Sequence, residues 1–334
     1  MEFRSLGSSG LKVSSLCMGT MTFGNQADKK TSFAMLDRAW EAGINFIDTA
    51  DGYPLGGSFE QLGSTESFIG EWLRTRRDKF VLATKCFMPM GPNVNERGLS
   101  RKHIMEAVEN SLRRLNTDYL DLYQAHQFDP ETPIEETMRA FDDLVRQGKV
   151  RYIGVSNWKA WQVMKGLSLA ENKNYVRINS VQPRYNLLFR LIEEELVPLC
   201  LSEGVGIISY NPLAGGMLTG RYQPGQTVEE NTRFSLGGVY QAGILYKERY
   251  WQEPVFAAVE RYRAWCRENA YDMATTAVRW VMHQPGITSV IVGASRPEQL
   301  DASLAATDLP PLGAKDINWL SDLWFSLPRR QDNR

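Results

Sequence analysis

The ten residues INFIDTADGY, at positions 44–53, change character halfway along. Phe46 and Ile47 are apolar and typical of a buried strand, whereas Asp48 and Tyr53 follow within a few positions. In parallel α/β proteins, functional side chains gather where the strands end, at the carboxyl-terminal mouth of the sheet or barrel. This stretch therefore predicts a buried strand whose polar end reaches a site.

Short β-branched or apolar runs of this kind alternate with longer helical patterns along most of the chain. Such alternation indicates parallel strands joined by helical crossovers. Eight candidate strands suit a closed (β/α)8 TIM barrel, although an open doubly wound sheet has the same alternation of strands and helices. No linker or break in composition interrupts the pattern, so we expect a single domain over residues 1–334. The candidate strands are SSLCMGTM (14–21), INFIDTA (44–50), FVLATKC (80–86), YLDLYQAH (119–126), VRYIGVSN (150–157), INSVQPRYN (178–186), VGIISYNP (205–212) and ITSVIVGAS (287–295).

The spacers between these runs place apolar residues at helical intervals. Ser100 is positioned to cap the helix of SRKHIMEAVENSLRRLN, and Pro133 stands at the expected first position of PIEETMRAFDDLVRQGK. Pro198 must kink or delay the helix of EEELVPLCLSEG, because proline has no backbone N–H to donate.

Two segments lie outside this alternation. Residues 3–16, FRSLGSSGLKVSSL, predict a short β-hairpin that turns at Ser9-Gly10 before the first barrel strand. Residues 221–251 are rich in glycine and aromatic residues and have no strong period. A loop of this length in a compact domain is usually a lid or a binding loop. We therefore expect a barrel with an N-terminal hairpin and long loops on its carboxyl-terminal face.

Composition excludes several classes of protein. A net charge of −1 with 43% hydrophobic residues is ordinary for a globular protein and gives no basic footprint for nucleic acid. No apolar run approaches the ~18 residues that span a bilayer, and MEFRSLGSSG has no signal-peptide core. The cysteines are widely spaced, which favours free thiols in a reducing cytoplasm. We expect the basic tail LPRRQDNR to be solvated. The four cysteines are Cys17, Cys86, Cys200 and Cys266.

Polar side chains mark the ends of several candidate strands. Asp48 and Tyr53 end the second strand, Lys85 the third and His126 the fourth. A phenol titrates near pH 10, so it needs help to act as an acid at neutral pH. A neighbouring lysine would lower the pKa of the phenol, an aspartate would hold that lysine charged, and a histidine would orient a carbonyl oxygen. Taken singly, each residue has an ordinary structural explanation, as a cap, a core histidine or a surface lysine; their joint placement favours a site for proton transfer.

The chain resembles the aldo-keto reductases over nearly its whole length. The resemblance lies in INFIDTADGY, LATK, SLRRLNTDYLDLYQAH, TPIEETMRAFDDLVRQGKVRYIGVSNW, NPLAGGMLTGRY and IVGASRPEQL, together with the opening segment FRSLGSSGLKVSSLCMGTMTFG. Within the family, the chain is most similar to the group that contains bacterial members and potassium-channel β subunits.

This resemblance implies a (β/α)8 barrel, bound NADPH or NADP, and reversible reduction of aldehydes or ketones to alcohols. The catalytic tetrad of the family corresponds to Asp48, Tyr53, Lys85 and His126, with Tyr53 as the proton donor. The hydride comes from the nicotinamide, so no metal is implied. The implied partner is a small carbonyl substrate.

The resemblance also implies a set of cofactor contacts. Thr20, Met21 and Asp48 would lie near the nicotinamide ribose. Arg296 and Ser295 would bind the adenosine 2′-phosphate and favour NADPH over NADH. The carboxamide would be held by Ser156, Asn157 and Gln182, the nicotinamide ring by Tyr210, the pyrophosphate by Asn211, Pro212, Leu213, Ala214, Gly216, Arg221 and Arg233, and the adenosine end by Gly293, Ser295, Arg296, Gln299 and Ser303. The chain departs from the family at Ala302 and Ser303, where many members have an acidic residue and asparagine, and at Gln127 and Phe128, beside the substrate.

Two other functions stay open at this stage. The first is an NADPH-binding sensor like the channel β subunits, with marginal turnover, although we expect no channel-blocking segment before the barrel. The second, a metal-dependent hydrolase, has little support because the three histidines are not at ligand spacing. We expect apolar or aromatic carbonyl substrates, bound by the loops at 53–62, 87–98 and 221–251, with Phe87, Met88, Met90, Phe234, Tyr240 and Trp251 as lining or as loop packing.

Overall fold

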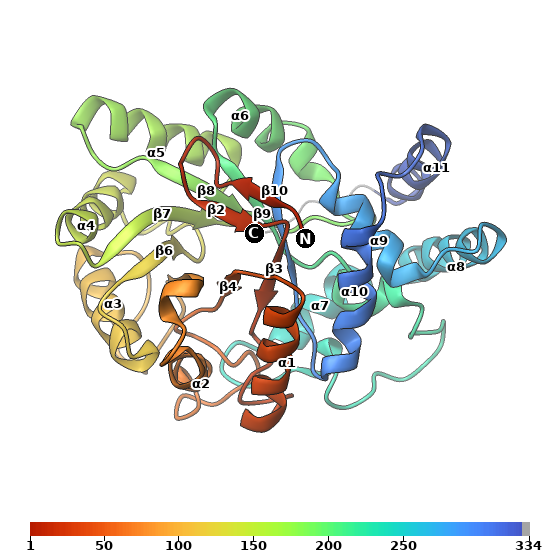
Figure 1. Cartoon of the computed structure of the whole chain (residues 1–334), viewed down its shortest axis with the longest axis horizontal. Coiled ribbons are helices and arrows are strands. Elements are labelled where there is room, and N and C mark those ends of the chain that lie inside the picture. The colour runs from red at the N-terminus through yellow and green to blue at the C-terminus, as the bar shows by residue number, and fades with distance from the viewer. Residues whose placement is uncertain (329–334) are drawn as a thin grey trace.

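The computed structural model describes residues 1–328 and contains the predicted closed barrel (Figure 1). Its eight strands are all parallel and follow one another in chain order around the barrel, with the last strand beside the first. The tail residues 329–334 lie outside the described residues. The barrel strands are β3 (Leu16–Gly19), β4 (Phe46–Asp48), β5 (Val81–Cys86), β6 (Leu120–Ala125), β7 (Val150–Ser156), β8 (Ile178–Gln182), β9 (Gly206–Ser209) and β10 (Ile287–Val292).

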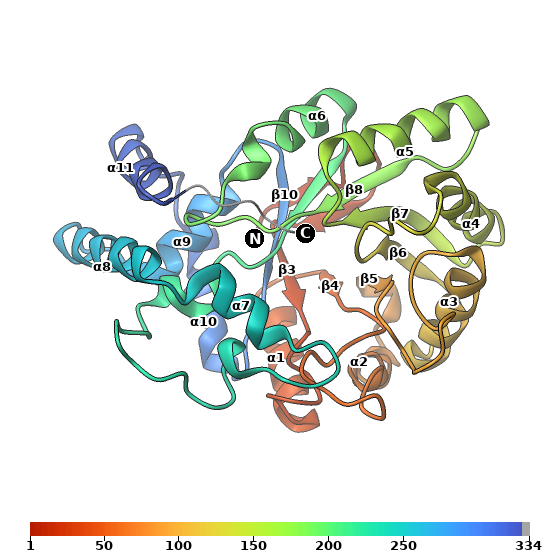
Figure 2. The same ribbon diagram turned by 180° about the vertical axis from the view of Figure 1, so that it is seen from behind.

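Helices surround the barrel, as Figures 1 and 2 show from opposite sides. Each candidate strand of the sequence became a barrel strand, so the (β/α)8 interpretation is confirmed and the open-sheet alternative is wrong. No helix within residues 1–328 is both long and apolar enough to cross a bilayer. The helices are α1 (Lys29–Glu41), α2 (Ser64–Leu73), α3 (Arg101–Leu115), α4 (Ile134–Arg146), α5 (Ala160–Lys173), α6 (Leu196–Glu203), α7 (Ala242–Tyr250), α8 (Glu253–Glu268), α9 (Met273–Met282), α10 (Asp301–Ala305) and α11 (Ala314–Phe325).

The cap and proline positions at the helix ends agree with the sequence predictions, with two small differences. Ser100 caps α3 by accepting a hydrogen bond from the backbone N–H of His103, as predicted. Pro133 is the residue before α4 rather than its first residue. Pro198 delays α6 instead of kinking it: the helix begins at Leu196, which places the proline in the first turn, where no backbone N–H is needed.

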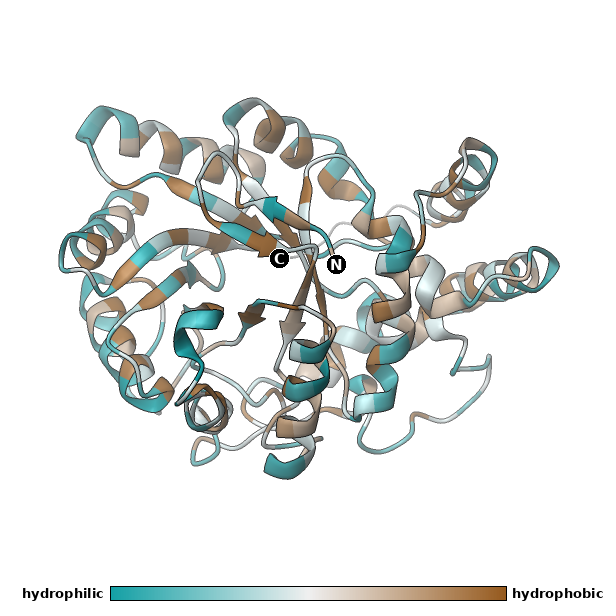
Figure 3. Cartoon of the chain, in the orientation of Figure 1, coloured by the Kyte–Doolittle hydropathy of each residue, from teal (hydrophilic) through white to brown (hydrophobic). Residues whose placement is uncertain are grey.

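Apolar side chains form two layers, one inside the barrel and one between barrel and helices. In Figure 3, brown is common along the barrel strands, with paler and teal bands between, and the surrounding helices alternate between brown and teal. Because side chains alternate along a strand, Leu122 of β6 points into the barrel while its neighbour Tyr123 packs against the helices. The inner layer comprises Leu6, Val13, Cys17, Phe46, Val81, Ala83, Leu122, Ile208 and Ile291.

The N-terminal hairpin, β1 (Phe3–Ser5) and β2 (Lys12–Ser14), closes the end of the barrel away from the site. Leu6 N–H donates to the carbonyl oxygen of Leu11, so the chain reverses over residues 7–10, which include the predicted Ser9-Gly10; the tightest part of the turn centres on Gly7 and Ser8. Gly7 has φ of +58°, and a Cβ there would lie 2.5 Å from the carbonyl oxygen of Gly204. This close contact requires glycine and fixes the turn against the barrel floor.

We expect Leu6→Ala to destabilise the protein by about 2–5 kcal/mol, because the change opens a cavity where the hairpin fills the end of the barrel. Leu6 is fully buried in the inner layer, whereas Leu11 on the same hairpin is only partly buried. Leu11→Ala is therefore the matched control, with an expected loss below about 2 kcal/mol. Urea unfolding followed by circular dichroism measures both, and equal losses would show that the hairpin does not plug the barrel.

Residues 221–251 are more ordered than the sequence predicted. They contain the 3₁₀ turn Arg233–Ser235 and the helix α7, so the interpretation of this segment as a loop throughout is wrong. Figure 2 shows α7 in front of the barrel, on the side turned away from the viewer in Figure 1. The sequence of α7, AGILYKERY, has no clear apolar face, which is why the sequence pattern did not predict a helix there.

Candidate active site

A cavity of about 640 Å³ opens at the carboxyl-terminal mouth of the barrel. Its wall is formed by strand ends together with the turn after β4, the loop after β5, and the segment around α7. Asp48, Tyr53 and His126 contribute to this wall, and Lys85 lies buried behind it. The strand ends therefore converge as the polar residues in the sequence predicted.

Asp48 and Lys85 form a buried ion pair. The Lys85 Nζ lies 2.5 Å from Asp48 Oδ2 and also donates to the carbonyl oxygen of Thr49 at 2.8 Å. Burial alone lowers the pKa of the Lys85 ammonium, but Asp48 and the Tyr53 phenol outweigh it, so the pKa of Lys85 lies above its usual range. Lys85 is thus held charged and oriented at neutral pH.

Tyr53 lies between this pair and His126. The Lys85 Nζ is 5.3 Å from the centre of the Tyr53 ring, and the His126 ring stands nearly perpendicular to that ring at 5.8 Å between centroids. Burial raises the pKa of Tyr53 above its usual range, and Lys85 opposes this effect without overcoming it. The lysine lowers the pKa of the phenol as expected, but burial, which the sequence did not reveal, has the larger effect. A buried phenol is fully protonated at neutral pH, which is the form a proton donor needs.

Hydrogen bonds link further predicted residues into the same mouth. Gln182 Nε2 donates to Asp48 Oδ1 at 2.8 Å, and Ser156 Oγ donates to the backbone oxygen of Gln182 at 2.9 Å. Tyr210 OH donates to Asn157 Oδ1 at 2.8 Å, while Asn157 Nδ2 donates to the backbone oxygen of His126 at 3.0 Å. These contacts tie β4, β6, β7, β8 and β9 together at one level of the barrel.

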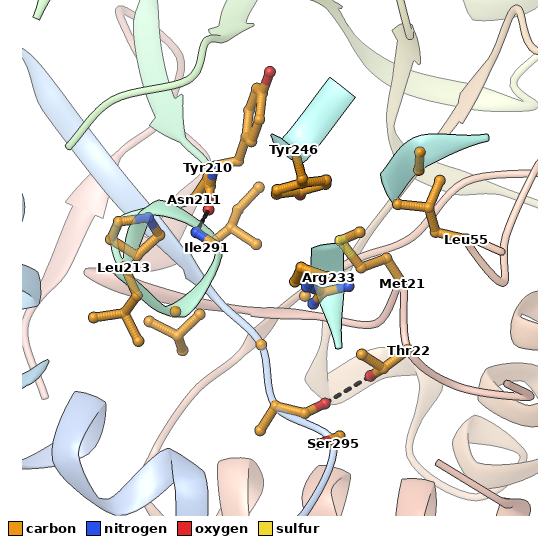
Figure 4. Close-up of a pocket in the computed structure, with 18 of the residues that line it drawn as sticks. Met21, Thr22, Leu55, Tyr210, Asn211, Leu213, Arg233, Tyr246, Ile291 and Ser295 are labelled. Carbon is orange, nitrogen blue, oxygen red and sulfur yellow. Dashed lines mark hydrogen bonds between the residues drawn. The ribbon is translucent and has the colours of Figure 1, made fainter. Parts of the chain in front are cut away.

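Most of the predicted cofactor residues line the cavity. Figure 4 shows Met21, Tyr210, Asn211, Leu213, Arg233 and Ser295 around it. Ala214 is fully buried and Arg296 is exposed, and neither lies on the wall. Residues on the wall that were predicted from the sequence are Thr20, Met21, Asp48, Ser156, Asn157, Gln182, Tyr210, Asn211, Pro212, Leu213, Gly216, Arg221, Arg233, Gly293, Ser295, Gln299 and Ser303.

The cavity wall offers a hydrogen-bond donor for an anion at Arg233. Arg233 lies on the wall, and its buried Nη1 makes no hydrogen bond within residues 1–328. Gly215 and Gly216 both have left-handed φ angles, of +69° and +100°, in the turn that follows Asn211. The backbone N–H groups of Gly215 and Gly216 already donate within this turn, to Asn211 Oδ1 at 2.6 Å and to the carbonyl oxygen of Leu213 at 2.9 Å. The guanidinium of Arg233 is therefore the group on this wall that suits a phosphate.

Of the six apolar or aromatic residues that the sequence offered as lining or as loop packing, two reach the cavity wall. Met88 and Tyr240 line it, whereas Phe87, Met90, Phe234 and Trp251 do not. Phe234 and Trp251 pack against each other at 4.8 Å between ring centroids and hold the segment around α7 in place. Leu55, Leu245, Tyr246 and Arg249 also line the cavity. They lie within the predicted binding segments 53–62 and 221–251, but the sequence did not single them out, because the last three belong to the unpredicted helix α7.

Asp51, the second carboxyl group of the opening stretch, lies outside the cavity wall and is fully buried. Burial and the neighbouring Glu66 raise the pKa of Asp51 well above its usual range, against the effect of Arg114. Glu66 accepts hydrogen bonds from Thr84 and Arg114. Asp51 therefore belongs to a buried polar cluster behind the site, between α2, α3 and β5.

The described residues form a closed barrel with a buried Asp–Lys pair next to a tyrosine at its mouth, an arrangement that is chemically suited to proton transfer. The family model for the aldo/keto reductase family matches residues 15–324. The chain belongs to this family, and its membership supports an oxidoreductase activity.

Similar proteins include both enzymes and channel subunits. An uncharacterized oxidoreductase, YrpG, of Bacillus subtilis (strain 168) is 37% identical over 332 residues, which cover 97% of this chain and 96% of that protein. A probable voltage-gated potassium channel subunit beta of Arabidopsis thaliana is 37% identical and covers 93% of each chain. The protein tas of Escherichia coli (strain K12) is 36% identical, covering 92% of this chain and 94% of that protein.

Proposed function

We propose that this protein catalyses the reversible reduction of an aldehyde or ketone to the alcohol with NADPH. One observation supports this most strongly: the buried Asp48–Lys85 pair lies against the ring of Tyr53, and Tyr53 and His126 both face the cavity. Family membership supports the reaction class, and the unused donor of Arg233 supports a phosphate-bearing cofactor.

Each side chain would have a distinct task in this reaction. Tyr53 gives its hydroxyl proton to the carbonyl oxygen as that oxygen gains negative charge. The Lys85 ammonium stabilises the phenolate that forms, and Asp48 keeps Lys85 charged and in place. His126 donates to the same carbonyl oxygen and orients it. When bound, the nicotinamide supplies the hydride.

The cofactor would lie along the predicted residues that line the cavity. Ser156, Asn157 and Gln182 would hold the carboxamide, and Tyr210 would lie flat against the nicotinamide ring. Arg221 and Arg233 would contact the pyrophosphate, and Ser295 and Gln299 the adenosine end. Ser295 already donates from both its backbone N–H and its Oγ to Gln299 Oε1, and these two hydrogen bonds hold the two residues together on the cavity wall.

The direct test is NADPH depletion, followed at 340 nm, over a broad library of aldehydes and ketones, with NADH measured in parallel. We expect turnover near the ~10 per second typical of enzymes on the best substrates. Rates below roughly one per minute on every substrate would contradict the enzyme assignment. That outcome would favour the second candidate, an NADPH-binding sensor, which the similarity to potassium-channel subunits supports.

The lining of the substrate end supports apolar or aromatic carbonyl substrates. Leu55, Met88 and Leu245 offer aliphatic contacts, and Tyr240 and Tyr246 offer rings. Tyr246 belongs to α7 and lines the same cavity as Tyr53, so α7 contributes to the wall around the proposed acid. An aryl group that enters here would be buried between rings, which favours binding through its apolar area.

Cofactor preference gives a separate prediction. Arg296 is exposed at the edge of the adenosine end, where a free guanidinium could pair with a 2′-phosphate. We expect Arg296→Ala to weaken NADPH binding about tenfold, as expected for one charge-assisted hydrogen bond, and to leave NADH binding unchanged. Titration of intrinsic fluorescence measures both affinities. Arg38→Ala, which removes an exposed ion pair with Asp301, is the control. Equal losses for NADPH and NADH would exclude the role assigned to Arg296.

A further inference from the structure

Gln124 contacts the catalytic carboxylate without contacting the cavity. Its Nε2 donates to Asp48 Oδ1 at 3.1 Å, and its Oε1 accepts from Gln182 Nε2 at 3.3 Å. Gln182 Nε2 in turn donates to the same Asp48 oxygen at 2.8 Å. The three side chains therefore form a closed triangle of hydrogen bonds. Gln124 is fully buried and is absent from the cavity wall, whereas Asp48 and Gln182 both line it.

The register of the barrel brings these groups together. Gln124 on β6 stands opposite Lys85 on β5 and opposite Gly154 on β7. A Cβ at Gly154 would lie 3.2 Å from Gln124 Cγ and 2.5 Å from Ser180 Oγ. The lack of a side chain at Gly154 gives Gln124 room to lean across the interior toward Asp48.

The triangle uses every amide hydrogen of Gln182. One hydrogen bonds to Asp48 and the other to Gln124, so Gln182 presents only its Oε1 to the cavity. The triangle also occupies Asp48 Oδ1 with two donors, which leaves Oδ2 for Lys85. Without Gln124, the Gln182 amide is free to turn over and the carboxylate loses one of its donors.

We infer that Gln124 is a positioning residue for the reaction: it fixes the orientation of Asp48 and Gln182, and through them that of Lys85 and of the group bound beside Gln182. This inference rests on the proposed carbonyl reduction. It predicts that Gln124 affects catalysis through hydrogen bonding and not through the volume it fills.

Three variants separate these effects. Gln124→Met keeps the volume and loses both hydrogen-bonding groups, and we expect kcat to fall about tenfold, the effect of one hydrogen bond to a charged group. Gln162→Met is the matched control, because Gln162 is a buried glutamine that caps α5 far along the chain from the tetrad. We expect kcat of Gln162→Met to stay within about twofold of the parent.

The third variant, Gln124→Glu, tests hydrogen bonding through the pH dependence of kcat, which a change in packing alone would leave unaltered. In its protonated form the introduced carboxyl group donates to Asp48 and accepts from Gln182, as the glutamine amide does, whereas in its ionised form it repels Asp48. We therefore expect kcat of this variant to approach the parent value at the acidic end of the pH range and the Gln124→Met value at the alkaline end. The other titratable groups that act on Asp48 or Lys85 here are Tyr53, Cys17 and Asp51, which all variants retain.

A second measurement does not depend on turnover. In protein with ¹⁵N-labelled glutamine, we expect the side-chain amide hydrogens of Gln182 to exchange with solvent at least about tenfold faster in Gln124→Met than in the parent. Parental kcat together with parental exchange in Gln124→Met would overturn the inference. So would a lower kcat with a parental pH profile in Gln124→Glu, since that result indicates packing only. If the parent itself reduces no carbonyl, the proposed function fails, and the exchange rates still decide whether Gln124 orients Gln182.

Discussion

Tyr53→Phe should lower kcat for carbonyl reduction by about 10²- to 10⁴-fold, the range that a positioned general acid contributes. The hydroxyl is the only part of the side chain that this change removes, so the ring contacts with His126 and Lys85 remain. The affinity for NADPH should stay within about threefold, because the phenol is assigned to the substrate and not to the cofactor. Single-turnover kinetics and a fluorescence titration measure the two quantities separately.

Tyr240→Phe is the control for this prediction. Tyr240 also lines the cavity, but its hydroxyl donates to the backbone oxygen of Pro89 at 3.0 Å. We expect kcat of Tyr240→Phe to remain within about threefold of the parent, as for loss of a neutral hydrogen bond outside the reacting atoms. If Tyr53→Phe reduced a good substrate at the parent rate, or if both variants lost the same amount, Tyr53 would not be the acid.

Lys85→Met should affect both stability and catalysis. The change removes one partner of a fully buried ion pair and leaves the Asp48 carboxylate buried without its counter-charge. Breaking such a pair from one side costs about 3–5 kcal/mol of folding stability. Catalysis should fall by about 10²-fold or more, because the phenolate of Tyr53 would form without a neighbouring positive charge. Urea unfolding and steady-state kinetics provide the two measurements.

The double variant Asp48→Asn/Lys85→Met distinguishes the two effects. It removes both charges, so most of the lost stability should return. The lost activity should not return, because the ammonium is still missing. Lys102→Met, which breaks an exposed pair with Glu106 one helical turn away, should cost less than about 0.5 kcal/mol. A stable and fully active Lys85→Met protein would contradict the mechanism proposed for Tyr53.

Much of the site was readable from the sequence because parallel strands end at a common edge. Asp48, Lys85 and His126 each follow a recognisable apolar run, and the barrel brings those three strand ends to one cavity or directly behind it. The residues of α7 were not readable in the same way. Tyr246 and Arg249 lie on a helix without an apolar stripe, and only its packing over the barrel mouth places them in the cavity wall.

The sequence by itself determined the alternation of strands and helices, the polar ends of the strands and the family, since each is encoded within a few neighbouring residues. Only the tertiary structure decided which side chains share a charge or a hydrogen bond. Gln124 looks like any strand residue until the barrel closes and Gly154 leaves room for its amide to reach Asp48. The sign of the pKa change at Tyr53 is also a tertiary property, because burial comes from the whole mouth of the barrel and outweighs the single lysine beside it.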